Sequence, residues 1–90
     1  MKRWMLATWT AAVCSTLAAT ALADVEVAVE ELPEAARHTV VREVKGGQIL
    51  EIERDDEHGQ TVYEVEFVES SIKYEIDVAP DGGLLRRHRD

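Results

Sequence analysis

The chain has 90 residues, of which 46% are hydrophobic and 31% are charged, and its formal net charge is −8. All 18 acidic residues follow Ala23, whereas Lys2 and Arg3 are the only charged residues before it, so the remainder carries a charge of −10. This negative charge disfavours nucleic-acid binding and electrostatic attachment to anionic lipid. Because the only cysteine is Cys14, the remainder has no disulfides or thiolate metal sites.

Residues 1–23 have the three parts of a secretory signal peptide. Lys2 and Arg3 supply the positive start, residues 4–17 are apolar, and Ala21-Leu22-Ala23 puts small residues at the cleavage-determining positions. We therefore predict an exported protein, periplasmic or extracellular, whose mature chain begins at Asp24.

This segment has two alternatives to cleavage, a membrane anchor and a lipid anchor. Residues 4–23 are uncharged and about long enough to cross the roughly 30 Å hydrocarbon core, but their Ala and Thr content favours transient passage. Lipidation at Cys14 is disfavoured because Val13 is branched where a lipoprotein signal has a small residue. We expect no stable membrane anchor after cleavage.

Residues 24–31 alternate valine with charged or small residues, which fits either a short edge strand or a solvated leader. A helix is predicted next, over residues 33–45, because Pro33 suits a first helical turn. Gly46 and Gly47 are expected to end it by adopting the left-handed conformation. Its predicted apolar face consists of Leu32, Ala36, Val40, Val41 and Val44.

After Gly47 the apolar residues recur every second position, which predicts strands. Turns are expected at residues 55–60, 69–71 and 80–83, the last from Pro80 and two glycines. Residues 84–88 can return as a fourth strand. The inward side chains are expected to be Leu50 and Ile52; Tyr63, Val65 and Phe67; and Ile72, Tyr74, Ile76 and Val78.

The predicted fold class is therefore α+β, with one amphipathic helix packed on a four-stranded antiparallel β-meander. Residues 24–31 add a leader or a short extra edge strand. The expected organisation is a signal peptide at 1–23, this leader at 24–31, and one domain at 32–90.

Three segments resemble the PepSY domain: Leu32-Pro33-Glu34-Ala35-Ala36, Val62-Tyr63-Glu64-Val65-Glu66, and residues 73–78 leading into Asp81-Gly82-Gly83-Leu84-Leu85. The resemblance covers about residues 32–87. It implies an exported, non-enzymatic module similar in fold to β-lactamase-inhibitor protein, without catalytic residues or cofactors. The family name reflects a proposed role in restraining peptidases. No peptidase domain follows in this sequence, so we expect restraint to act on a separate exported protein.

Candidate metal ligands gather in one predicted turn, at Asp55, Asp56, Glu57 and His58. The spacing lacks the alternate-residue ligands of a calcium loop, and one histidine gives zinc too few nitrogen partners. A solvated turn is therefore favoured. His38, His58 and His88 show no catalytic spacing, and Tyr63, Phe67 and Tyr74 are interpreted as core residues rather than a ligand-stacking surface.

Two charged surfaces are candidates for partner binding, with Glu64 and Glu66 representing one, and Arg86 and Arg87 the other. The outward sheet face is acidic and could steer a basic partner. The basic run at residues 86–89 could bind an acidic partner, but pairing with Glu75, Asp77 or Glu53 within the domain is favoured. The alternative function is a small acidic periplasmic protein that binds divalent cations. The sequence does not determine the oligomeric state.

Overall fold

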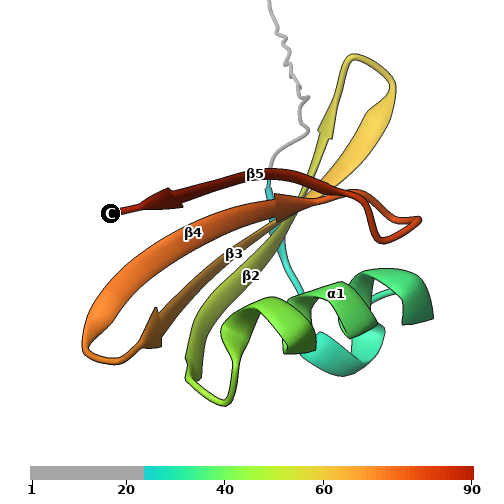
Figure 1. Cartoon of the computed structure of the whole chain (residues 1–90). Helices are drawn as coiled ribbons and strands as arrows, with labels where there is room; N and C mark the ends of the chain where they lie inside the picture. Colours follow the sequence, from blue (N-terminus) through green and yellow to red (C-terminus); the bar gives the residue numbers. More distant parts are fainter. Residues whose placement is uncertain (1–23) are drawn as a thin grey trace, which may run out of the picture.

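The computed structural model describes residues 24–90 and places five antiparallel strands beside one another in chain order, with an α-helix across one face (Figure 1). The predicted signal peptide lies outside the described residues. Within those residues, no helix is both long and apolar enough to cross a bilayer. The elements are β1 (Val25–Glu26), a 3₁₀ turn (Val29–Glu31), α1 (Glu34–Val44), β2 (Gln48–Glu57), β3 (Gln60–Glu69), β4 (Ile72–Val78) and β5 (Leu84–Arg89).

The amino-terminal end of the described chain forms a short edge strand. Of the two interpretations of residues 24–31, the edge strand is therefore correct and the solvated leader is not. Val25 and Glu26 lie opposite Arg54 and Glu53 in antiparallel register. The amide of the next residue, Val27, donates a 2.9 Å hydrogen bond to the Ile52 carbonyl. The fold class is therefore confirmed as α+β, with β1 as the short fifth strand.

Helix α1 packs on the sheet through the side chains that recur every four residues. Ala36, Val40 and Val44 are buried, as predicted. The prediction for Val41 is wrong, because this side chain is 59% exposed. Val41 is rotated about 100° from Val40 around the helix axis, and the helix buries only the stripe that faces β3 and β4. Thr39 is buried in its place.

The helix ends one residue earlier than the glycines alone suggest. Lys45, not glycine, caps the helix in the left-handed conformation, with φ of 55°. Gly46 follows at φ of 79°, and Gly47 then approaches β3 closely. A Cβ atom on Gly47 would collide with the backbone carbonyl oxygen of Val68, so only glycine fits at this crossing.

The start of β2 corrects the predicted alternation. The pairing with β3 shifts between Ile49 and Glu51, which marks a β-bulge at Leu50. Leu50 is 45% exposed, contrary to the prediction, while Ile49 packs against the core. One extra residue in a bulge reverses the inward and outward positions on either side of it.

The first two predicted turns are shorter than expected. Backbone pairing between β2 and β3 continues to Glu57 and Gln60, leaving only His58 and Gly59 in the turn. The second turn consists of Ser70 and Ser71. As a result, the tip of the β2–β3 hairpin projects beyond the rest of the sheet (Figure 1).

The hydrophobic core lies between α1 and the inner face of β2, β3 and β4. Phe67 is fully buried and stacks on Tyr74 at a centroid distance of 5.5 Å, which confirms that the aromatic residues pack in the core. No residue of β5 is buried. The core consists of Leu32, Ala36, Val40, Val44, Ile52, Tyr63, Val65, Phe67, Ile76 and Val78.

Candidate functional site

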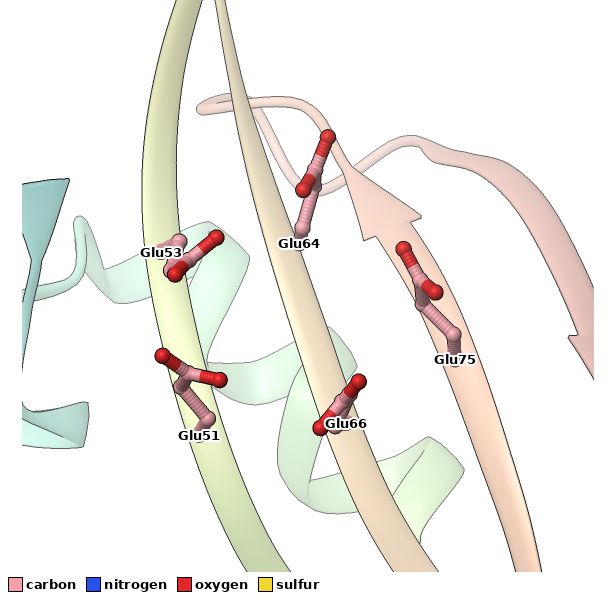
Figure 2. Close-up of a pocket in the computed structure, with 5 residues that line it drawn as sticks. All are labelled: Glu51, Glu53, Glu64, Glu66 and Glu75. Atoms are coloured by element: carbon pink, nitrogen blue, oxygen red, sulfur yellow. The ribbon is translucent and has the colours of Figure 1, made fainter. Parts of the chain in front are cut away.

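The sheet face that lies opposite α1 carries a patch of carboxylates, called the acidic face below. Alternation along each strand puts these side chains outward, because their neighbours in sequence fill the core. Figure 2 shows five of them, drawn from three adjacent strands. The acidic face consists of Glu51, Glu53, Glu64, Glu66, Glu75 and Asp77.

The strand register places these carboxylates directly opposite one another. Between β2 and β3, Glu51 lies opposite Glu66, and Glu53 lies opposite Glu64. Between β3 and β4, Glu64 lies opposite Asp77, and Glu66 lies opposite Glu75. Like charges at directly opposed positions destabilise a sheet. The face therefore holds electrostatic repulsion in the folded state.

Two of these carboxyl groups respond to this environment with raised pKa values. Partial burial, reinforced by the charges of Asp77 and Asp55, raises the pKa of Glu64 from 4.5 to about 7. The pKa of Glu53 is also raised to about 7, chiefly by a hydrogen bond with the Glu51 carboxyl group. A proton on one group allows that bond to form, so near-neutral pH leaves the face partly protonated.

Basic residues compensate only one side of the acidic face. Arg86 Nε lies 3.2 Å from Asp77 Oδ2, and Arg86 Nη2 lies 3.9 Å from Glu75 Oε2. Lys73 Nζ lies 3.8 Å from Glu66 Oε1. Within residues 24–90, no ion pair reaches the remaining carboxylates, which are Glu51, Glu53 and Glu64.

The two candidate arginines of β5 lie on opposite faces of the sheet. Arg86 pairs with Glu75 and Asp77, which confirms the interpretation favoured from sequence. Arg87 instead crosses to the helix side, where Nη1 lies 2.9 Å from Glu43 Oε1. Its guanidinium also lies 4.6 Å from the centroid of the Tyr74 ring. Sequence reasoning missed this partner because Glu43 lies on α1, distant in the chain.

The predicted turn cluster is divided between the end of β2 and the turn itself. Asp56 Oδ1 accepts a 2.7 Å hydrogen bond from Thr61 Oγ1, and Asp56 Oδ2 lies 3.8 Å from Arg54 Nε. His58 is exposed in the turn, and Asp55 also has an interaction partner. Among the side chains that the structure describes, those of this turn do not converge as a group of three ligands. Metal binding there stays a prediction.

Comparisons with known proteins agree with the fold and the motifs described above. The family model of the PepSY domain, described as "Peptidase propeptide and YPEB domain", matches residues 18–81. The chain belongs to the PepSY family. The motifs gave a span of about residues 32–87, so the family model begins earlier and ends earlier. Strand β5 lies beyond the end of the matched span.

The PepSY domain also has a structural neighbour of known coordinates. This is a crystal structure from Bacteroides eggerthii DSM 20697, provisionally described as a periplasmic protein, with a TM-score of 0.67 and 18% sequence identity. The match covers 73% of this chain and 51% of that one, so the chain spans about half of the neighbour's length. The likeness shows a shared fold. No curated protein matches the chain.

Elsewhere in this PepSY domain, three groups of side chains offer ligand atoms within 4.8 Å of one another. They are Glu75, His88 and Asp90; Asp24, Glu53 and Glu64; and Glu64, Glu75 and Asp77. In the first group, His88 Nε2 lies 3.7 Å from Glu75 Oε1 and 4.0 Å from Asp90 Oδ1.

Two features of this first group disfavour metal coordination. A metal on Nε2 would leave the proton of His88 on Nδ1, which is buried and has no hydrogen-bond partner. Arg86 and Lys73 also lie within 3.9 Å of Glu75 and Asp90, respectively. These cations already neutralise the two carboxylates.

The three histidines lie on three different elements of the PepSY domain. His38 is on α1, His58 is in the β2–β3 turn, and His88 is on β5. Within residues 24–90, none of them hydrogen-bonds a hydroxyl group. The hollow over the five glutamates has a volume of about 40 Å³, which has room for only a few water molecules. The acidic face is thus better shaped for a macromolecular surface than for a small substrate.

Proposed function

We propose that this PepSY domain is an exported, non-catalytic binding module that acts on another exported protein, with restraint of a peptidase in trans as its expected role. Membership of a family described by peptidase propeptides supports this role. The observation that carries it is the partly uncompensated acidic face, which offers Glu64 and Glu66 to a basic partner. The short basic strand β5 supplies Arg86 at the margin of this face and Arg87 on the helix side.

A basic partner would relieve the repulsion that the strand register creates. Lysine or arginine side chains placed near Glu53 and Glu64 would favour their ionised forms and lower their raised pKa values. Binding would therefore release protons, and the affinity should increase as the pH rises from about 5 to 7.5. Association should also slow as salt is added.

The proposal is tested by capturing partners from the exported fraction of the source cells. With a captured partner, the double variant Glu64→Lys/Glu66→Lys should associate about tenfold more slowly at low salt, with a smaller change in dissociation. Glu30→Lys/Glu34→Lys makes the same change in net charge on the exposed segment that leads into α1 and should have little effect. A parallel assay measures inhibition of exported peptidases. Capture of no exported protein, together with no inhibition, would contradict the proposal.

Divalent-cation binding is the second candidate function. It is favoured by the convergence of Asp24, Glu53 and Glu64, whose carboxylate oxygens lie within 4.8 Å of one another. Calcium prefers such oxygen ligands, and binding must stabilise the folded state by mass action. If calcium or zinc raises the melting temperature by several degrees while no protein partner is found, this function replaces the first.

A further inference from the structure

The strand β5 forms one edge of the sheet, and its side chains are not part of the core. β5 pairs with β4 on one side and has no strand on the other within the described residues. We propose that this free edge binds an extended acidic segment of the partner protein, which adds a further strand to the sheet. The inference rests on the proposed function and assigns one contact of the bound partner.

The backbone groups of β5 alternate in direction, toward β4 and away from it. The Asp90 amide donates a 2.9 Å hydrogen bond to the Lys73 carbonyl of β4. In an antiparallel pair, residues that exchange hydrogen bonds alternate with residues that do not. His88, opposite Glu75, therefore also faces β4, whereas the backbone groups of Arg87 and Arg89 point away from the sheet. An added strand would satisfy these groups.

The side chains beside this edge are basic. Arg86 and His88 lie on the outer face, while Arg87 and Arg89 lie on the helix side. Guanidinium groups donate hydrogen bonds and cannot accept them. Carboxylates opposite these arginines would stabilise an added strand, whereas lysine or arginine opposite them would destabilise it.

Two of the arginines are suited to receive such a carboxylate. Arg87 is held in place by Glu43 and by the Tyr74 ring, so little conformational freedom remains to be lost on binding. Arg89 forms no ion pair within residues 24–90, which leaves its charge free for a partner.

An open groove lies at the start of β5. Leu85, which is 57% exposed, lines a groove of about 410 Å³ together with Val62 and Pro80. An apolar side chain at one end of the added segment would occupy part of this groove. The occupant is therefore an extended segment with several carboxylates and a terminal apolar residue.

Protection against self-association is the competing explanation for these arginines. Natural sheets place charged residues on edge strands to prevent pairing between copies. That role predicts binding of neither acidic nor basic peptides, and dimer formation when the charges are removed.

The test uses the protein as purified from the exported fraction, at about 150 mM salt, where charges more than about 8 Å apart are largely screened. The probe is the capped peptide Thr-Glu-Val-Glu-Thr-Glu-Leu, and the control has lysine in place of glutamate. Hydrogen exchange followed by NMR should show the Arg87 and Arg89 amides slowed at least tenfold by the glutamate peptide. The Arg86 and His88 amides, which already face β4, should change little.

Two substitutions at one position separate strand addition from simple charge attraction. Arg89→Gln removes the charge and should weaken peptide binding about threefold. Arg89→Pro also removes the outward amide and should weaken binding at least tenfold, while the melting temperature stays near that of the parent, because this amide donates no bond within the sheet.

Equal losses for the two variants, equal binding of the lysine peptide, binding of neither peptide, or unchanged exchange at Arg87 and Arg89 would overturn the proposal. A captured partner distinguishes this failure from failure of the proposed function. If that partner binds Arg89→Pro as tightly as the parent, the domain is a binding module but β5 is not its docking edge.

Discussion

The two faces of the same sheet have opposite effects on stability. On β3, Val65 and Phe67 point toward the helix and are fully buried, whereas Glu64 and Glu66 point away and lie opposite other carboxylates. Burying one large apolar side chain stabilises a fold by roughly 1.5–3 kcal/mol, while each opposed pair of like charges costs at most about 1 kcal/mol. The inner face therefore determines whether the domain folds. The acidic face can remain electrostatically unfavourable and available for binding.

The largest effect is expected from a charge placed on the inner face. Val40→Asp should unfold the domain, because an unpaired buried carboxylate costs several kcal/mol and a small domain has a total stability of about 5 kcal/mol. Val41→Asp is the matched control, since the neighbouring side chain is 59% exposed, and it should melt near the parent temperature. Circular dichroism with temperature measures both. Similar melting of the two variants would show that the helix faces the sheet differently.

A smaller effect is expected from the polar group that lies within the inner layer. The Thr39 hydroxyl donates a 2.6 Å hydrogen bond to the Gly82 carbonyl, which ties α1 to the turn before β5. Thr39→Val keeps the shape but leaves this carbonyl without its partner, so it should lower the free energy of unfolding by about 1–2 kcal/mol. Thr39→Ser should restore most of the loss in denaturant titrations. Equal stability of the valine and serine variants would contradict this role.

The acidic face should make stability depend on pH. The pKa of Glu64 is about 7 in the folded protein and 4.5 in a solvated chain, so the folded state holds its proton more tightly. The contribution of Glu64 to the free energy of unfolding is therefore fully present below about pH 4.5 and is lost as the pH rises through 7. After a discount for solvent exposure, the loss is roughly 1 kcal/mol, or about 4–8 °C in melting temperature.

Glu64→Gln tests this dependence directly. The outward position alone predicts a nearly neutral substitution, but the register predicts a gain of roughly 1 kcal/mol at pH 8 and little change at pH 4. Glu30→Gln, at an exposed site before α1, should follow the parent at both pH values. Loss of stability in Glu64→Gln at pH 8 would show that the face does not oppose folding.

The smallest effects are expected where β5 joins the two faces. Arg87→Gln removes the contacts with Glu43 and Tyr74 and should cost about 0.5–1 kcal/mol. Arg86→Gln removes more exposed pairs on the acidic face and should cost less than about 0.5 kcal/mol. Denaturant titrations measure both variants. Titrations of Glu43→Gln and of the double variant Glu43→Gln/Arg87→Gln complete a double-mutant cycle, which gives the coupling energy between Glu43 and Arg87. An equal cost for both arginines would contradict the difference between their environments.

The features of the fold that are local in sequence could be predicted from it. Alternation located the strands and the inward side chains of β3, and Pro33 marked the start of α1. The phase at the start of β2 could not be predicted, because the bulge at Leu50 depends on hydrogen bonds with β3. The exposure of Val41 likewise depends on where the helix lies over the sheet.

The acidic face was only partly predictable for a similar reason. The outward direction of Glu64 and Glu66 follows from alternation, but their like-charged opposite residues depend on the two-residue turns that set the register. Arg87 and Glu43 are 44 positions apart in the chain. No local pattern connects two such residues, and only the packing of α1 beside β5 brings them together.

The bulge at Leu50 makes β2 tolerant of the loss of one residue. Side chains along a strand alternate between the two faces of the sheet, so deleting one residue ordinarily moves every following side chain to the opposite face. Leu50 is the extra residue of its bulge, and without it Ile49, Glu51 and Ile52 would still alternate inward, outward and inward. Deletion of Leu50 should therefore leave the other side chains of β2 on their present faces of the sheet. Deletion of Val65 from β3 would instead reverse the inward and outward positions that follow it and expose the core.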